Sequence, residues 1–282
     1  MKIKKFIILL SVLLYPILTF GCNSQKAISE QDPEYKYWEK LNQNVVLLYK
    51  QGKVNDAYNY AEEALKIARN IFSNNNPKVA ASLNNLAEIY RAIGKYKEAE
   101  GYYKEALKID QKAFGKNHED VARDLNNLAV LYRLENKLND AEKLYKESLL
   151  IREKVLGKDH PEVAISLSNI GVLYRVKNDY KNAETYLKKA LAIREKSLGK
   201  EHPDTAISLN NLAELYTIQG EYSKAEPLFK ESIRILQSKL GKTHPNVALV
   251  MKNLSQLYLN LGKTELAKKL NNDALLILSQ KK

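Results

Sequence analysis

The chain has 282 residues, of which 45% are hydrophobic and 28% are charged, and its formal net charge is +12. This hydrophobic content is ordinary for a folded protein and argues against disorder. The charge excess favours acidic partners or an anionic membrane surface, and a single cysteine excludes an internal disulfide.

The N-terminus has the three parts of a secretory signal peptide. Three lysines within the first five residues precede an apolar run at 6–20, and the small residue Gly21 ends the segment. The run contains Pro16 and is shorter than the roughly 20 residues that a membrane-spanning helix needs. We therefore predict a signal peptide over residues 1–21 and an exported protein, with an uncleaved membrane anchor as the alternative.

The only cysteine, Cys22, follows this segment directly. The stretch Leu18-Thr19-Phe20-Gly21-Cys22 resembles a bacterial lipoprotein box, although its second and third residues depart from the usual ones. The resemblance implies that the cysteine is acylated and becomes the mature N-terminus. The protein would then be a lipid-anchored lipoprotein in the cell membrane or outer membrane of a bacterium; an incidental thiol is the alternative. The polar residues 22–37 are predicted as a tether, with packing expected to begin near Tyr37 and Trp38.

Export also bears on the basic charge. Removing residues 1–21 removes three lysines and no acidic residue, which leaves a net charge of +9. Nucleic acid is a poor partner for an exported protein, and the lysines lie beside glutamates on predicted helical faces. We interpret the charge as a solvated surface, with an acidic partner or an anionic membrane as the alternative.

The remainder of the chain repeats one motif every 42 residues. A fixed period of this size is typical of stacked supersecondary units that share one elongated core. We predict a solenoid over residues 38–282 with about six repeats, at 41–82, 83–124, 125–166, 167–208, 209–250 and 251–282. The motif is Leu83-Asn84-Asn85-Leu86-Ala87, Leu125-Asn126-Asn127-Leu128-Ala129, Leu167-Ser168-Asn169-Ile170-Gly171, Leu209-Asn210-Asn211-Leu212-Ala213 and Met251-Lys252-Asn253-Leu254-Ser255.

Each unit contains two helical patterns. In the second unit, apolar residues at helical spacing mark a first helix that ends near Tyr90 and a second helix that begins near Tyr96. Gly94 lies between them, and glycine or asparagine fills this slot in every unit. These residues tolerate the left-handed conformation that ends many helices. A small residue such as Ala99 recurs on the second helix, where it lets the two helices approach closely.

The segments His-Pro-Glu/Asp-Val-Ala, Leu-Asn-Asn-Leu-Ala-x-Leu-Tyr and Ile-Arg-Glu-Lys-x-Leu-Gly-Lys recur through residues 41–282. This pattern resembles the tetratricopeptide repeat, and its length resembles the kinesin light chain type. The resemblance implies an all-α fold, a right-handed α-solenoid of stacked helix-turn-helix repeats with a concave groove that holds peptides. In the first unit, Tyr49 indicates a slip of one residue. In the last unit, Asn271 replaces an aromatic residue, as expected where a solenoid end faces water.

Catalysis and metal binding find little support in the sequence. The four histidines occupy one repeat position, and successive repeats lie about 8–10 Å apart, too far to share a zinc ion with bonds of about 2 Å. Asn76 fills the same slot, which favours a helix-capping role. The Gly-Lys-Thr segments at 241–243 and 262–264 lack the earlier glycine of a phosphate-binding loop. We predict a non-enzymatic protein without metal or cofactor; an enzyme with an unrecognised site is the least favoured alternative. The histidines are His118, His160, His202 and His244.

The candidate binding face is one arc of the first helices. Steps of 100° place residues 81, 84, 88 and 91 together beside the core stripe, and the family resemblance places this arc on the concave wall. Asparagine can pair with a peptide backbone, arginine suits a carboxylate, and Val130, Ile165 and Val172 offer an apolar floor. The predicted peptide-binding residues are Asn84, Arg91, Arg123, Asn126, Arg133, Ser168, Arg175 and Asn210.

A second asparagine series is open to two interpretations. Asn85, Asn127, Asn169 and Asn211 could contact a ligand, or they could bond the backbone between stacked helices. The arginines could likewise form an ordinary surface face, and the tyrosines that end the first helices are predicted to be core residues. The sequence thus predicts a monomeric, membrane-tethered scaffold that binds an extended or helical segment of a protein, with acidic segments favoured. A regulatory module that senses a small peptide is the alternative.

Overall fold

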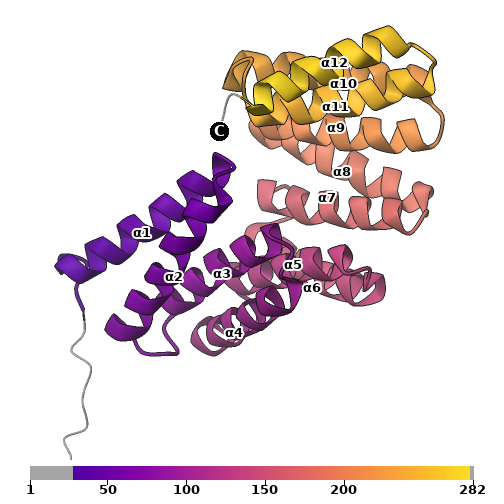
Figure 1. Cartoon of the computed structure of the whole chain (residues 1–282). Helices are drawn as coiled ribbons and strands as arrows, with labels where there is room; N and C mark the ends of the chain where they lie inside the picture. Colours follow the sequence, from indigo (N-terminus) through magenta and orange to yellow (C-terminus); the bar gives the residue numbers. More distant parts are fainter. Residues whose placement is uncertain (1–27, 280–282) are drawn as a thin grey trace, which may run out of the picture.

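The computed structural model describes residues 28–279, and this part of the chain forms twelve α-helices and no strand (Figure 1). The helices form six helix–turn–helix repeats, numbered from repeat 1 (α1 and α2) to repeat 6 (α11 and α12). Their bounds are α1 Pro33–Lys50, α2 Val54–Ile71, α3 Pro77–Ala92, α4 Tyr96–Phe114, α5 Glu119–Leu134, α6 Leu138–Leu156, α7 Pro161–Val176, α8 Tyr180–Leu198, α9 Pro203–Ile218, α10 Tyr222–Leu240, α11 Pro245–Asn260 and α12 Thr264–Ser279.

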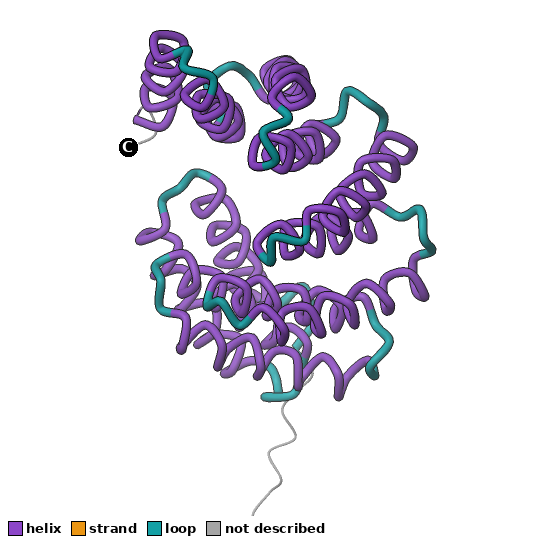
Figure 2. Tube along the Cα trace, turned by 90° about the vertical axis from the view of Figure 1, so that its right-hand side faces the viewer, coloured by secondary structure: helices purple, strands orange, loops and turns teal. Residues whose placement is uncertain are grey.

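The repeats stack into a curved solenoid, as predicted (Figure 2). First helices of successive repeats touch one another, for example α1 with α3 and α7 with α9. Among the described residues, second helices of successive repeats make no comparable contact. Because helices converge on the inside of a curve, the first helices form the concave wall and the second helices form the convex wall.

Side-chain caps begin the first helices of repeats 2 to 6. Oδ1 of Asn76 accepts from the backbone N–H of Lys78 at 2.9 Å, and Nδ1 of His118 accepts from that of Asp120 at 3.2 Å. The other three histidines cap α7, α9 and α11 in the same way. Each cap satisfies one of the N–H groups that a helix start leaves unpaired. The predicted capping role of the histidines is therefore confirmed.

A residue in the left-handed conformation ends each first helix. Gly94 has φ of 79°, and Asn136 and Asn178 have φ of 61° and 60° at the equivalent point. Glycine adopts this conformation without strain, and asparagine tolerates it better than most residues. This restriction explains why the slot alternates between these two residue types, as the sequence indicated.

Both helices of a repeat contribute large and small side chains to the core, such as Leu86 and Ile89 on α3 and Ala99 on α4. Tyr103 and Tyr145 are fully buried, as are Ala87 and Ala129 at the matching first-helix position. In repeat 4 the two helices approach each other closely, because a Cβ on Gly171 would lie 2.7 Å from Cγ of Leu187. Each repeat therefore packs its two helices against each other and completes the burial of its apolar side chains by stacking on its neighbours.

The tyrosines that end the first helices also link repeats. The hydroxyl of Tyr132 donates to Glu100 and that of Tyr174 donates to Glu142, each at 2.8 Å and each on the second helix of the preceding repeat. These two rings are half-buried, whereas Tyr90, Tyr216 and Tyr258 are buried as predicted. The prediction of a pure core role is thus too simple, since the hydroxyls serve as ties between repeats.

Repeat 1 keeps the register of the others, so the predicted slip is wrong. The N–H of Gly52 bonds to the carbonyl of Tyr49, as the N–H of Gly94 bonds to that of Arg91. Tyr49 therefore occupies the position of Arg91, and Leu48 takes the place of the tyrosine that ends the other first helices.

The N-terminal end of the solenoid begins earlier than the sequence suggested. Helix α1 starts at Pro33, and Tyr35 is buried, although both lie within the segment 22–37 expected as a tether. The ring of Tyr35 packs edge-on against Trp38 and Phe72 at centroid distances of 5.6 and 6.0 Å. This aromatic cluster anchors the start of α1.

The predicted signal peptide and Cys22 lie outside the described residues. Within residues 28–279, no helix combines the length and the apolar character that crossing a membrane requires.

Candidate functional site

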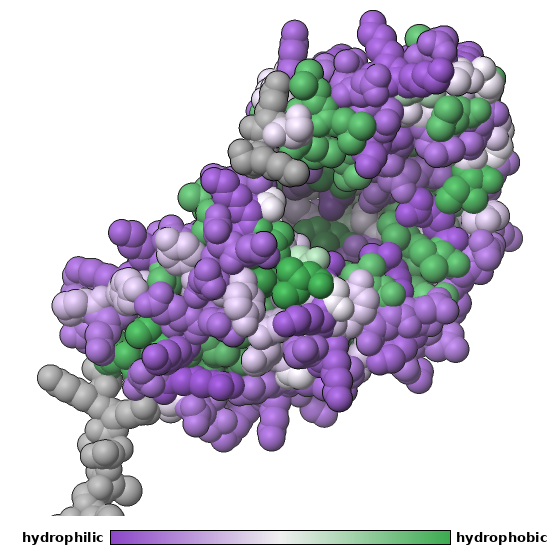
Figure 3. Space-filling model, in the orientation of Figure 1, coloured by the Kyte–Doolittle hydropathy of each residue, from purple (hydrophilic) through white to green (hydrophobic). Residues whose placement is uncertain are grey.

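The candidate site is the concave wall, and Figure 3 shows a hollow on the molecule between its N-terminal and C-terminal helices. We call the side chains that the first helices present at the positions of residues 84, 85, 88 and 91 the groove wall. A polar hollow of 380 Å³ lies on this wall, between α3 and α5. It is lined by Ala81, Asn84, Asn85, Glu88, Arg123 and Asn127.

A larger hollow of 570 Å³ lies on repeat 1 and is mainly apolar. Trp38, Val46 and Leu47 line it, and Lys50 and Lys78 are among its polar residues. Sequence reasoning missed this surface because repeat 1 lacks the arginine and leucine-asparagine-asparagine signals that marked the other units.

Arg91, one of the three predicted groove arginines, is held by the protein itself. Its guanidinium forms an ion pair with Glu88, which also accepts hydrogen bonds from the hydroxyls of Tyr49 and Tyr103, each at 2.7 Å. Burial raises the pKa of a carboxyl, but the bonds from Arg91 and the two tyrosines outweigh it and lower the pKa of Glu88. Burial and the Glu88 carboxylate raise the pKa of Tyr49 to about 12. The network is therefore a closed one, with its charge neutralised.

Arg175 is held in a similar way across two repeats. Its Nη1 lies 2.5 Å from Oε2 of Glu214 on the next first helix. The other carboxylate oxygen of Glu214 accepts from the amides of Asn210 and Asn253 at 2.7 and 2.8 Å. Two of the predicted groove arginines thus have carboxylate partners inside the protein.

Arg133 differs from both, because it has no ion pair among the described residues. Val130 and Val172 occupy the positions that correspond to Glu88 and Glu214. Nε of Arg133 is enclosed and has no acceptor, as is also true of Nε of Arg175, so the difference between them is the ion pair that Arg175 makes through Nη1. The side chain of Arg133 as a whole is half-buried. The arginine lies beside Tyr145, where it opposes the burial that raises the pKa of the hydroxyl, and that hydroxyl has no acceptor among the described residues.

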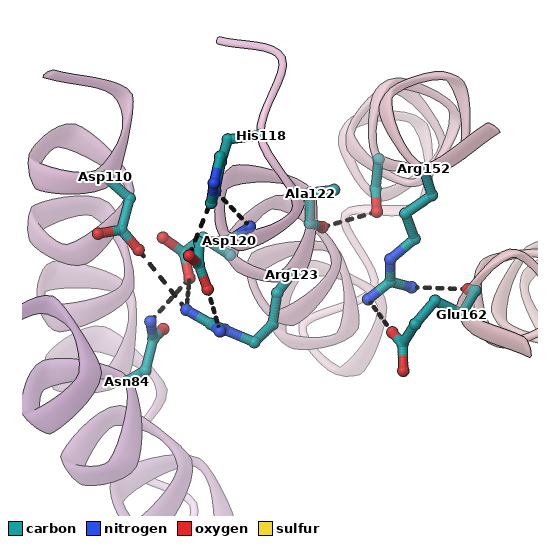
Figure 4. Close-up of polar contacts among 10 residues, drawn as sticks. Asn84, Asp110, His118, Asp120, Ala122, Arg123, Arg152 and Glu162 are labelled. Atoms are coloured by element: carbon teal, nitrogen blue, oxygen red, sulfur yellow. Dashed lines mark hydrogen bonds and ion pairs between the residues drawn. The ribbon is translucent and has the colours of Figure 1, made fainter. Parts of the chain in front are cut away.

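Arg123 is turned toward acidic residues of the joint between repeats 2 and 3 (Figure 4). It forms an ion pair with Asp120, and its Nη2 lies 3.6 Å from Asp110 and 3.7 Å from Asp124. Nδ2 of Asn84 donates to Asp124 at 2.7 Å. Both Asn84 and Arg123, predicted as ligand contacts, are therefore engaged in this joint.

The two carboxyls of this joint are almost fully buried, with 1% of Asp110 and none of Asp124 exposed. Burial raises the pKa of both groups, that of Asp124 to about 8, despite the nearby Arg123. In the next two joints the equivalent pairs are an arginine and a serine. Arg152 donates to Ser166 at 2.9 Å and Arg194 donates to Ser208 at 2.7 Å.

The asparagines form hydrogen-bonded pairs between first helices rather than bonds to the backbone. In each pair, Nδ2 of the asparagine at the second asparagine position of the motif donates to an asparagine of the preceding repeat. The accepting atom is Oδ1 of the residue at the first asparagine position there. The pairs are Asn85 with Asn42 at 2.7 Å, Asn169 with Asn126 at 2.8 Å and Asn253 with Asn210 at 2.9 Å. Repeats 3 and 5 break this ladder: among the described residues, the amides of Asn127 and Asn211 have no partner, and Oγ of Ser168 is buried without one.

A family model provides the identification. The model for the tetratricopeptide repeat matches residues 39–112, 94–153, 120–196 and 162–238, which together cover more than half of the chain. The chain belongs to the tetratricopeptide repeat family. Repeats of this family typically serve as non-enzymatic scaffolds, and no curated protein matches the chain.

Several tetratricopeptide repeat structures share the fold. BtubC (BKLC) from P. vanneervenii is 19% identical, with a TM-score of 0.60 over 86% of this chain and 91% of that one. A putative kinesin light chain from Podosopora anserina is 24% identical, with a TM-score of 0.56 over 73% and 98%. A Rap protein complexed with Competence and Sporulation Factor is 16% identical, with a TM-score of 0.66 over 92% and 79%. These likenesses confirm the predicted solenoid and its resemblance to the kinesin light chain type.

Proposed function

We propose that this tetratricopeptide repeat protein is a scaffold that binds a peptide segment of an acidic partner protein in its concave groove. The observation that carries the proposal is the contrast between bonded and free side chains on the groove wall. Arg91, Arg175 and three asparagine pairs are bonded internally, whereas Asn127 and Asn211 have no hydrogen-bond partner and the guanidinium of Arg133 has no ion pair among the described residues. Two of these three side chains, Asn127 and Arg133, lie on α5 at the centre of the wall, and Asn211 lies on α9.

The chemistry of this central part suits a peptide. An asparagine amide can donate to a backbone carbonyl and accept from a backbone N–H at once, and a guanidinium binds a carboxylate through two parallel bonds. The half-buried Val130, Val172 and Ile165 supply an apolar floor between them. The net charge of +9 that remains without residues 1–21 adds a long-range attraction for an acidic partner.

We also propose that the scaffold is exported and held at a bacterial membrane by a lipid on Cys22. The support is the signal-like segment 1–21 and the position of the sole cysteine directly after it. The test is incorporation of radiolabelled palmitate in bacteria that express the wild type or Cys22→Ser. Label is expected only in the wild type, and equal labelling of the two would disprove the anchor.

Site-specific photo-crosslinking tests the groove. A photoreactive residue replaces Asn127 on the concave wall or, as the matched control, the exposed Lys143 on the convex helix α6. Each protein is irradiated in cells and the crosslinked partners are identified. A partner captured from position 127 and not from position 143 is expected. Capture only from position 143 would place the binding surface on the convex wall and refute the proposal.

The likeness to a Rap protein complexed with Competence and Sporulation Factor favours one alternative, a regulatory module that senses a small peptide. A scaffold should keep its curvature when loaded. Small-angle scattering with and without the captured partner's peptide separates the two, because a regulatory module should change its radius of gyration.

A further inference from the structure

The closed networks show which chemical group the groove arginines of this protein bind. In repeat 2, Glu88 accepts from Arg91 and from the buried hydroxyl of Tyr103. In repeats 4 and 5, Arg175 is bound by Glu214. In both cases the acceptor is a carboxylate at the same repeat position, four residues after the first asparagine of the motif.

Repeat 3 has the same donors without that carboxylate. Arg133 corresponds to Arg91, Tyr145 corresponds to Tyr103, and Val130 stands in place of Glu88. The hydroxyl of Tyr145 is in a side chain with 0% exposure and has no acceptor. The guanidinium of Arg133 has no ion pair among the described residues, whereas those of Arg91 and Arg175 each have one. Leaving such groups unpaired is costly, so the arrangement retains donors whose acceptor is absent from the described residues.

We propose that repeat 3 is a carboxylate-binding subsite, in which a carboxylate of the bound peptide takes the place that Glu88 has in repeat 2 and accepts from Arg133 and Tyr145. This inference rests on the proposed function, since it specifies one contact of the same groove. It also fixes the position of the peptide along the groove, because the other two groove arginines already hold carboxylates of the protein.

The surroundings define the ligand further. Val130 packs against the same apolar cluster as Tyr145, and Val172 and Ile165 are half-buried on the next first helix. A peptide that fits this subsite carries one acidic side chain, or its C-terminal carboxylate, directly beside an apolar side chain. A run of acidic residues fits less well, because the valines offer no partner for a second charge.

The test uses the full chain, solubilised in detergent, on an array of immobilised nonapeptides of random sequence. Each peptide is present with Asp or Asn at its centre and with a free or amidated C-terminus, so that the two sources of the carboxylate are distinguished. The wild type is expected to bind the acidic form of its best peptides about tenfold or more tightly than the neutral form, which corresponds to about 1.4 kcal/mol.

Two substitutions at one position separate charge from bulk. Val130→Glu supplies the missing carboxylate from the protein, as Glu88 does in repeat 2, and should abolish the preference for acidic peptides. Val130→Gln adds the same bulk without the charge. If Val130→Glu loses more of the preference for acidic peptides than Val130→Gln does, the additional loss is due to occupation of the subsite by the glutamate. Arg133→Gln removes the donor and should also abolish the preference. Arg91→Ala should retain it, because Arg91 is already paired with Glu88.

Equal binding of acidic and neutral peptides by the wild type overturns the subsite, and so does a preference that survives in both Val130→Glu and Arg133→Gln. If Asn127→Ala weakens peptide binding while the preference is absent, groove binding stands and only the carboxylate subsite fails. If neither Asn127→Ala nor Arg133→Gln weakens the binding of any peptide, the proposed function fails as well.

Discussion

Repeats 2 and 3 have equivalent helix pairs and equivalent cores, but they differ in where their polar groups have bonding partners. On the groove wall, repeat 2 is closed by Glu88 and repeat 3 is open at Arg133. At the joint with the following repeat, it is repeat 3 that has the well-bonded side chain and repeat 2 that does not. The Asp110 carboxyl of repeat 2 is buried against a second carboxyl, whereas Arg152 of repeat 3 donates to a serine and to a backbone carbonyl.

The comparison shows how a repeat protein can assign different roles to equivalent positions. The core stripe must be retained in every unit, because each unit completes its burial against its neighbours. The polar positions on the groove wall and in the joints are free of that constraint. Binding specificity can therefore arise where one repeat loses an internal partner that the others keep.

The acidic joint gives the largest expected effect. Because the pKa of Asp124 is about 8 in the folded protein and about 4 in an unfolded chain, the folded state retains a proton that the unfolded state has lost between these values. Stability from this proton is present below about pH 4 and is lost as the pH rises through about 8. Relative to Asp124→Ser, the wild-type free energy of unfolding should fall as the pH rises from 5 to 8, at most by about 1.4 kcal/mol per pH unit for the one proton held.

Urea denaturation at several pH values measures this difference. Asp124→Ser copies Ser166 and Ser208, which fill the position in the next two repeats. The charged groups around the pair are Asp120, Arg123 and His118, and they are unchanged in the variant. If the free energy of unfolding changes with pH in the same way in the wild type and in Asp124→Ser, Asp124 ionises normally. The proposed difference between the acidic joint and the arginine–serine joints would then be contradicted.

A second prediction compares the two buried tyrosines. The hydroxyl of Tyr103 donates to Glu88 at 2.7 Å, so Tyr103→Phe leaves a buried carboxylate with one donor fewer and should cost about 1–3 kcal/mol. The hydroxyl of Tyr145 has no partner, so Tyr145→Phe should be neutral or slightly stabilising. Thermal denaturation of both variants provides the comparison. A larger loss for Tyr145→Phe than for Tyr103→Phe would contradict the open state of repeat 3.

The smallest expected effect concerns the asparagine ladder. Asn169→Ala removes the 2.8 Å bond to Asn126 and should cost about 1 kcal/mol. Asn127→Ala removes no hydrogen bond among the described residues and should stay within about 0.5 kcal/mol of the wild type. Chemical denaturation distinguishes the two. Equal losses would indicate that Asn127 is bonded in solution and is unavailable to a ligand.

The fold followed from the sequence because its signals are local and recur. The Leu-Asn-Asn period, the Gly or Asn slot and the capping position each specify a helix, a turn or a helix start without reference to distant residues. The register of repeat 1 was mistaken because Tyr49 was used as the marker instead of Gly52, and the glycine alone is tied to the turn geometry.

The state of the groove could not be derived in the same way. Whether an arginine is free depends on a residue three positions before it or 39 positions after it, as with Glu88 for Arg91 and Glu214 for Arg175. The alternation of glutamate and valine at this position was visible in the aligned repeats. Whether a given arginine reaches a glutamate, however, depends on how successive first helices pack, because this packing sets the distance between one repeat and the next.

The most direct test of the open subsite needs no ligand. It is the free energy of unfolding of Val130→Glu measured against Val130→Gln at pH 7. If Arg133 and Tyr145 are donors without an acceptor, the glutamate should be the more stable variant by about 1.5–3 kcal/mol, and this advantage should disappear as the pH falls below the carboxyl pKa of about 4. A glutamate variant that is less stable than the glutamine variant at pH 7 would contradict the account, because a buried carboxylate without donors is destabilising.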